Sequence, residues 1–162
     1  MINAIVCVDK NWGIGKNNDL LFNLKEDMKF FREKTKEKIV VCGYNTLLSF
    51  PGSKPLKGRS TIVLCPKEIE RDDCYCIHDF DEMVRLVKEL SKTQEVFIIG
   101  GAMLYKSMLP YYDRVYVTHV DADGQASVFF PNLLENGYFL TKKLYNTLDE
   151  NYSLEFTVYE RK

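Results

Sequence analysis

Short, nearly continuous apolar runs alternate with helical patterns along this chain, and this alternation most constrains its fold. The runs are residues 2–8 (INAIVCV), 38–42 (KIVVC), 60–65 (STIVLC) and 95–101 (EVFIIGG). A strand that is apolar at almost every position is typical of a sheet that is covered on both faces, as parallel sheets are. Segments with helical spacing separate the runs: 24–35, 45–50, 79–90 and 102–109. The order predicts an α/β fold with a mostly parallel sheet.

The end of the chain follows a different pattern. VYVTHV (115–120) predicts another strand, and CYCIH (74–78) a short one. Two alternating segments, 137–146 and 152–162, predict an antiparallel pair of strands at one edge of the sheet. No repeat or linker interrupts the 162 residues, so we expect one domain, 1–162, with a sizeable core. In such sheets ligands bind at the carboxyl ends of the strands.

Charge and composition exclude several classes of function. The net charge of −1 lacks the excess of Lys and Arg that nucleic-acid binding requires, so no nucleic-acid partner is expected. No apolar run approaches the roughly 18 residues of a membrane span, and residues 1–11 do not resemble a signal peptide. Five cysteines, an odd number, fit a reducing compartment. We expect a cytoplasmic protein without a membrane partner, and a monomer.

An acidic residue near the start of the first helix is the leading candidate for chemistry. On a helical projection Asp27 lies at the edge of the apolar arc of segment 24–35, between Phe30 and Phe31. A carboxylate beside aromatic rings costs several kcal/mol unless it is paired or its pKa shifts. Acidic residues stabilise the N-terminal turn of a helix, and this effect accounts for Glu26, which completes a capping box with Asn23. It accounts less well for the presence of Asp27, which points towards the other face. A functional acid and a partly exposed helix-start acid remain equal alternatives at this point.

Cys74, Cys76 and His78 alternate, so a strand would place them on one face. This spacing differs from the usual CxxC of zinc sites, and no second pair of ligands follows. Cysteines are also common in cores. A core position is therefore the favoured interpretation, and no metal is expected.

Glycines at two junctions between a strand and a helix are candidates for binding an anion. Gly100 and Gly101 end one buried strand, and Gly43 with Thr46 follows another. Backbone N–H groups at such junctions can approach a phosphate, although a simple tight turn is the favoured explanation of the glycines at this point. Arg59 in the loop PLKGR can hold a carboxylate with two parallel hydrogen bonds, or it can belong to a solvated turn.

Several segments, taken together and in order, carry a family resemblance. They are IVCVDKNWGIGKNNDLLFNLKEDMKFFREKT, CGYNT, PLKGR, VFIIGGAMLY, YVTHVDA, FFP and FTVYER. From Ile2 to about Lys162 the chain resembles dihydrofolate reductases of the bacterial chromosomal type. The resemblance implies a three-layer α/β fold with an eight-stranded, mostly parallel sheet, an antiparallel C-terminal hairpin and four flanking helices. It also implies that the chain reduces 7,8-dihydrofolate to tetrahydrofolate with NADPH and is a target of antifolate inhibitors.

The resemblance also implies roles for individual residues. Asp27 would orient the pterin and promote protonation of its nitrogen 5, with help from Thr118 and Phe22. The other residues implied at the substrate are Ile5, Cys7, Leu20, Met28, Phe31, Phe50, Leu56, Arg59, Ile99 and Tyr105. Those implied at the cofactor are Cys7, Ile14, Gly15, Gly43, Tyr44, Asn45, Thr46, Leu64, Cys65, Lys67, Ile99, Gly100, Gly101, Ala102, Met103, Leu104 and Tyr105. Segment 14–23 would form a mobile lid.

The chain departs from the family pattern at several of these positions. Tyr44 stands where the family usually has an arginine, and Cys65 and Pro66 replace a polar pair that often lies near the 2′-phosphate of NADPH. We therefore expect weakened discrimination between NADPH and NADH. Leu21 and Phe22 stand where Pro-Trp is common, so the indole N–H donor is lost.

Two other functions remain alternatives. A pyrimidinone reductase of riboflavin synthesis would share the cofactor site but would not need Asp27 or Arg59. A binding protein without catalytic activity would fit the altered turn at 43–46.

Overall fold

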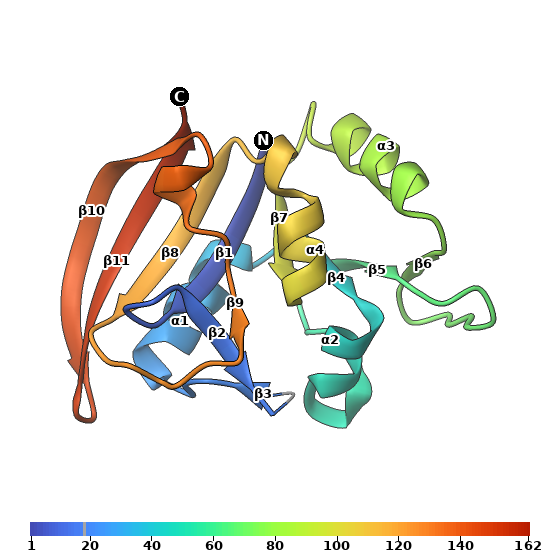
Figure 1. Cartoon of the computed structure of the whole chain (residues 1–162). Coiled ribbons are helices and arrows are strands. Elements are labelled where there is room, and N and C mark those ends of the chain that lie inside the picture. The colour runs from blue at the N-terminus through green and yellow to red at the C-terminus, as the bar shows by residue number, and fades with distance from the viewer. Residues whose placement is uncertain (18) are drawn as a thin grey trace. The chain divides into compact units, whose positions relative to one another are not determined.

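The computed structural model describes residues 1–17 and 19–162 (Figure 1). Eight strands form one sheet in the order β10-β11-β8-β1-β7-β4-β5-β6, and three strands form a smaller sheet in the order β3-β2-β9. The described residues contain four α-helices, so the predicted mixed sheet with four helices is confirmed. Contacts group the chain into two compact units. The first unit is Met1–Asn3 and Thr35–Tyr111, and the second is Ala4–Lys34 and Tyr112–Lys162. The single domain stays a prediction.

The first unit contains the parallel part of the sheet. β4 (Ile39–Gly43) pairs in parallel with both β5 (Ser60–Leu64) and β7 (Val96–Gly100), and β5 pairs in parallel with β6 (Tyr75–Ile77). Their apolar side chains are buried because parallel strands of this kind are covered on both faces. The buried side chains include Val40, Val41, Ile62, Val63, Phe97 and Ile98.

The helices of the first unit follow the strands closely. α2 (Tyr44–Ser49) begins directly after β4, α3 (Phe80–Leu90) follows β6, and α4 (Ala102–Ser107) follows β7. The Asp79 side chain accepts a hydrogen bond of 3.0 Å from the Glu82 N–H and thereby caps α3. The single 3-10 turns η1 (Pro51–Ser53) and η2 (Leu109–Tyr111) follow α2 and α4.

The second unit contains the antiparallel part of the sheet. β8 (Arg114–Val120) pairs with β11 (Tyr152–Arg161), which pairs with β10 (Tyr138–Asp149). Figure 1 shows β10 and β11 as a long hairpin at the C-terminus. β1 (Ile2–Val8) begins in the first unit and continues into the second. The 3-10 turn η3 (Leu133–Glu135) precedes β10. The helix α1 (Lys25–Thr35) belongs to the second unit except for its last residue, Thr35, which is the first residue of the second segment of the first unit.

One part of the sequence interpretation was wrong. None of the strands expected from the sequence includes residues 9–23, but β2 (Gly13–Lys16) pairs with β3 (Asp19–Leu20) and with β9 (Val128–Phe129). These glycine- and asparagine-rich residues have little strand propensity of their own. Residue 18 of the expected lid lies outside the described part of the chain.

The carboxylate of Asp9 explains how this small sheet is held. Its Oδ1 accepts hydrogen bonds from the backbone N–H groups of Asn11 (2.8 Å) and Gly13 (2.7 Å), and its Oδ2 accepts from Gly124 N–H (2.9 Å). Asp9 is buried, with 1% of its surface exposed. A Cβ atom on Gly13 would lie 2.4 Å from the Cβ atom of Ala126, so only glycine fits there. Long-range contacts that sequence propensity does not report therefore order this segment.

Within the described residues, the longest helices, α1 and α3, have 11 residues each, and none could cross a bilayer.

Candidate functional site

Asp27 lies in the first turn of α1, in the second unit. The helix begins at Lys25, and the Leu24 carbonyl oxygen accepts a hydrogen bond of 2.9 Å from the Met28 N–H. Leu24 and Phe30 are buried, with 3% and 4% of their surface exposed, and fix the helix against the unit. The Asp27 side chain is half-buried between these apolar anchors.

The surroundings of Asp27 favour its protonated form. Burial raises the pKa of the Asp27 carboxyl, whereas hydrogen bonds with the Thr118 hydroxyl and the Cys7 thiol lower the pKa in part. The negative charge of Asp149 raises the pKa again. Thr118 is buried in β8, and Cys7 is half-buried in β1. The pKa of the Cys7 thiol is raised well above its ordinary value by burial and by Asp27, so Cys7 is a neutral donor to the carboxylate.

The start of α1 is capped differently from the sequence interpretation. Asn23 and Glu26 were expected to form a capping box, but the helix begins one residue later, and Asn23 is exposed. The backbone N–H of Glu26 instead donates a hydrogen bond of 2.7 Å to Oδ2 of Asp149, the last residue of β10. Asp149 thus satisfies a helix-start donor and places a second carboxylate near Asp27.

The apolar residue that follows Asp27 in α1 is open to solvent. Met28 is 51% exposed, and Phe31 of the same helix is half-buried. Leu20, in β3 of the same unit, is 75% exposed. The Phe22 ring packs edge-on against Tyr152, with centroids 5.1 Å apart. The predicted apolar stripe of α1 is therefore buried at its ends, at Leu24 and Thr35, and open in the middle. Exposed apolar groups around a half-buried acid mark a surface that binds a partly apolar ligand.

The remaining predicted residues of this unit line its strands. Ile5 is buried in β1, Ile14 is half-buried in β2, and Gly15 is buried beside it. The second unit thus brings Asp27, Thr118 and Cys7 together. It also contains Ile14 and Gly15 in the small sheet.

In the first unit the two predicted glycine junctions lie side by side, because β4 and β7 are neighbouring parallel strands. Gly43 and Gly101 precede α2 and α4, and neither helix start has a hydrogen bond from a capping side chain. Gly100 has φ of +130°, which favours glycine, and the Gly100–Gly101 peptide is cis. The hydroxyl of Thr46 lies 3.2 Å from the position of a Cβ on Gly101, so Thr46 lies against the second junction. Uncapped N–H groups of two helices therefore converge near Thr46.

The other predicted cofactor residues of this unit differ in exposure. Cys65, Leu104 and Tyr105 are buried, so any ligand would meet mainly their backbone. Met103 is 84% exposed. Asn45 and Lys67 are exposed, and Tyr44, Leu64, Ile99 and Ala102 are half-buried.

A hydrogen bond to Thr35, the last residue of α1, orients the Arg59 side chain. Its Nε donates a hydrogen bond of 3.0 Å to Thr35 Oγ1, and its Nη1 donates one of 2.7 Å to the Lys57 carbonyl oxygen. Phe50 and Leu56 are half-buried elsewhere in this unit. Arg59 therefore has a defined orientation, unlike a cation in a solvated turn.

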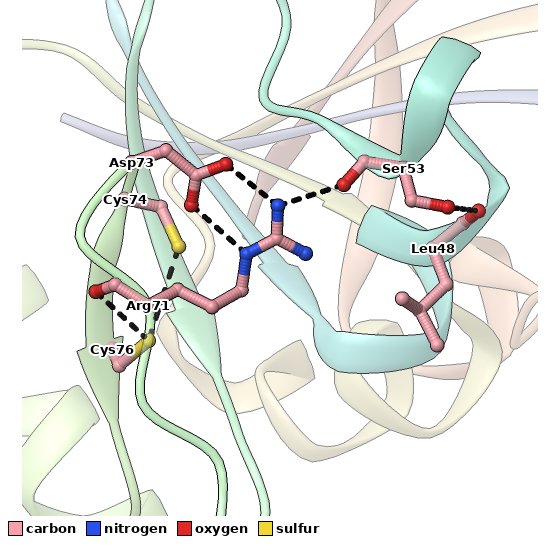
Figure 2. A network of polar contacts seen from close by, with 6 residues as sticks. All are labelled: Leu48, Ser53, Arg71, Asp73, Cys74 and Cys76. Carbon is pink, nitrogen blue, oxygen red and sulfur yellow. Dashed lines mark hydrogen bonds and ion pairs between the residues drawn. The ribbon is translucent and has the colours of Figure 1, made fainter.

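A second cation lies near Tyr44, the position where the family usually has arginine. The Arg71 guanidinium forms two hydrogen bonds with the Asp73 carboxylate, of 2.9 and 2.6 Å, and donates one of 2.8 Å to the Ser53 carbonyl oxygen (Figure 2). The hydrogen bond to Asp73 raises the pKa of Arg71, and the charges of Cys74 and Tyr44 act in the same direction. Tyr44 is thus near a guanidinium whose charge Asp73 already balances.

His78 does not join the cysteines. Its Nε2 lies 2.7 Å from Glu70 Oε1, and its Nδ1 lies 3.0 Å from the Pro66 carbonyl oxygen. Hydrogen bonding to Glu70 raises the pKa of His78. Within residues 1–17 and 19–162, no three His, Cys, Asp or Glu side chains are grouped as metal ligands would be.

Sequence reasoning missed three polar residues of these sites: Asp9, Asp149 and Arg71. Asp9 had a weak local signal, because an acid followed by glycines is typical of a turn. Asp149 had none, because its partner Glu26 is distant in sequence. Arg71 has a nearby partner in Asp73, but its contact with Ser53 spans 18 positions.

Comparison with known proteins places the chain in a family. The dihydrofolate reductase family model matches residues 1–161. The dihydrofolate reductase of Bacillus subtilis is 32% identical over 165 residues, which cover 100% of this chain and 95% of that protein. The enzyme of Mus musculus is also 32% identical, with 99% of this chain and 97% of that protein covered.

A solved structure gives the same relationship. Dihydrofolate reductase from Enterococcus faecalis, complexed with NADP(H) and RAB-propyl, superposes with a TM-score of 0.86 at 26% identity, covering 100% of this chain and 96% of that one. The match to the family model over nearly the whole length, and relatives above 30% identity, show that the chain belongs to the dihydrofolate reductase family.

Proposed function

We propose that this chain reduces 7,8-dihydrofolate to 5,6,7,8-tetrahydrofolate with NADPH, and that Asp27 is its proton-handling residue. The observation that carries the proposal is the half-buried carboxyl of Asp27, whose pKa is raised by burial while Thr118 and Cys7 hydrogen-bond to it. Family membership supports the overall reaction.

Asp27 would hold the pterin by hydrogen bonds to its 2-amino group and nitrogen 3. A carboxylate accepts both bonds at once and thereby fixes the orientation of a planar ring. The buried hydroxyl of Thr118 would keep the carboxyl in place, because it hydrogen-bonds to it from β8. The exposed side chain of Met28 and the ring of Phe31 would then contact the flat faces of the substrate.

The raised pKa of Asp27 suits the protonation of nitrogen 5. A group acts best as an acid when its pKa lies near the working pH, since it then holds a proton and can also release it. An exposed aspartate, with a pKa of about 3.9, would be ionised almost completely at neutral pH. Burial and the charge of Asp149 move Asp27 towards the useful range.

NADPH would supply the hydride. In the first unit, the uncapped N–H groups that follow Gly43 and Gly101 would hold its phosphates, with the Thr46 hydroxyl between them. In the second unit, Ile14 and Gly15 of β2 would contact the nicotinamide. The bound NADP(H) of the Enterococcus faecalis relative supports this cofactor.

Arg59 would bind the α-carboxylate of the glutamate tail. Thr35 and the Lys57 carbonyl orient its guanidinium, so little side-chain entropy is lost when the substrate binds. We also expect antifolate inhibitors to compete for this site.

A direct assay tests the proposal. Purified protein is mixed with NADPH and dihydrofolate, and oxidation of the nicotinamide is followed by its absorbance. Turnover that depends on both compounds supports the proposal. No turnover, with NADPH binding intact by calorimetry, would identify a silent binding protein. Reduction of a ribosylamino-pyrimidinone instead of dihydrofolate would identify the pyrimidinone reductase.

A further inference from the structure

The described residues include two thiols that lie next to each other outside the proposed site. Cys74 and Cys76 flank Tyr75 at the start of β6, and their Sγ atoms are 3.9 Å apart (Figure 2). β6 is the last strand in the order of the large sheet, and Tyr75 is 57% exposed. Both thiols are half-buried, so a small reagent can reach them from the sheet edge.

The positions of the two sulfur atoms bring them within reach of a bond. Cys74 lies in the bend that precedes β6, and Cys76 lies within the strand. The Sγ atoms are 3.9 Å apart, so a disulfide bond of about 2.0 Å requires a local shift of about 2 Å. A bond that needs such a shift is strained and is therefore easily reduced.

The other thiols of this unit are less suited to such a reaction. Cys42 and Cys65 are buried in the core cluster that also contains Leu47 and Val63, against which Cys74 and Cys76 pack. Cys42 and Cys65 have 0% and 4% of their surface exposed, whereas Cys74 and Cys76 are half-buried. A small disulfide therefore has less access to Cys42 and Cys65.

Arg71 provides local support for the reaction. Its carbonyl oxygen lies 3.9 Å from the Cys76 thiol, and its guanidinium is beside Cys74 (Figure 2). Burial raises the pKa of Cys74 to about 12, and the positive charge of Arg71 opposes this rise. We expect Cys76 to react first and Cys74 to resolve the intermediate.

We propose that Cys74 and Cys76 form a reversible disulfide with low-molecular-weight disulfides as the oxidant. The Cys76 thiolate attacks one sulfur of the small disulfide, which forms a mixed disulfide and releases one small thiolate. The Cys74 thiolate then attacks the Cys76 sulfur, which forms the Cys74–Cys76 bond and releases the second small thiolate. The two protein thiol protons pass to the released thiolates, so two protein thiols are oxidised and one small disulfide is reduced.

Mass spectrometry of the intact chain tests this proposal. The protein is incubated with oxidised glutathione, its remaining thiols are alkylated, and the peptide that contains residues 74–76 is sequenced. The expected product has lost two hydrogen atoms and carries no alkyl group at Cys74 or Cys76. Treatment with dithiothreitol is expected to restore both hydrogen atoms, so that both thiols are free again. Alkylation of both cysteines, or stable glutathione adducts on the wild-type pair, would overturn the proposal.

Three variants identify the partners. Cys74→Ser is expected to retain a glutathione adduct on Cys76, because no resolving thiol remains. Cys76→Ser is expected to give no internal bridge. Cys65→Ser is the matched control and is expected to form the bridge as the wild type does. A bridge that persists in Cys74→Ser, or disappears in Cys65→Ser, would show that Cys65 is the true partner and would contradict the assignment.

Discussion

The Asp149 carboxylate accepts a hydrogen bond of 2.7 Å from the backbone N–H of Glu26, the residue before Asp27, although 123 positions separate the two partners. This bond connects the end of β10 to the start of α1. It stabilises the first turn of the helix, and the charge that it brings raises the pKa of Asp27. Asp149 therefore has a structural effect and an electrostatic effect on the same site.

Two substitutions are expected to move the pH profile in opposite directions. Thr118→Val removes a hydrogen bond that lowers the pKa of Asp27, so the alkaline limb of the activity profile should move to higher pH. Asp149→Asn keeps an acceptor for the Glu26 N–H but removes the charge that raises the pKa, so the limb should move to lower pH. Steady-state kcat against pH measures both shifts. Shifts in the same direction would contradict this assignment of causes.

Asp27→Asn is expected to stabilise the fold at neutral pH. The pKa of the Asp27 carboxyl is higher in the folded chain than in the unfolded chain. Its contribution to the free energy of unfolding is therefore fully present below the pKa of the unfolded chain, about 3.9. This contribution is lost as the pH rises through the pKa of the folded chain. The neutral amide avoids this loss. A gain of about 1 kcal/mol corresponds to roughly 2–4 °C in Tm for a chain of this size. Thermal unfolding at pH 7 should show the increase, and the difference should vanish near pH 4. An unchanged or lower Tm at pH 7 would be inconsistent with a raised pKa.

Arg59→Gln is expected to weaken the binding of dihydrofolate without affecting the pterin site. Loss of a charge-assisted hydrogen bond costs about 1.5–3 kcal/mol, which is roughly a 10- to 100-fold increase in KM. The matched control is a 7,8-dihydropterin that lacks the glutamate tail, whose KM should change little. An equal increase for both substrates would indicate that Arg59 acts on the fold through Thr35.

Tyr44 is expected to determine the choice between NADPH and NADH. Asp73 already balances the nearby Arg71 guanidinium, so we expect only a modest preference of the wild type for NADPH. Tyr44→Arg should raise that preference at least about tenfold, because an arginine–phosphate hydrogen bond contributes about 1.5 kcal/mol or more. The ratio of kcat/KM for the two cofactors is the measurement. A strong wild-type preference for NADPH, unchanged in Tyr44→Arg, would refute this role for position 44.

The sequence predicted the parts of the fold that depend on local patterns. Continuous apolar runs located β1, β4, β5 and β7, and helical spacing located α3. The family resemblance was confirmed by the family model and by relatives over the whole length. The residue roles at the substrate and the cofactor stay predictions.

Features that depend on distant partners were not predictable. β2 and β3 consist largely of residues with little strand propensity, β9 has only two residues, and the Asp9 carboxylate organises the segment that contains β2. Asn23 had the appropriate sequence for a helix cap, yet Asp149 satisfies the Glu26 N–H. The Asp149 carboxylate and the Glu26 N–H meet only after the chain has folded. The Asp9 carboxylate combines the nearby N–H groups of Asn11 and Gly13 with the distant N–H of Gly124, so a local sequence window contains only part of this contact.

The most direct test of the central role of Asp27 is the rate of hydride transfer in a single turnover, measured against pH for the wild type and Asp27→Asn. We predict that the wild-type rate falls as the pH rises through the raised pKa of Asp27. We further predict that Asp27→Asn is slower by about 100- to 10,000-fold at neutral pH, the range for loss of a general acid, and lacks this pH-dependent step. A variant that keeps the wild-type rate and the same pH dependence would contradict the account.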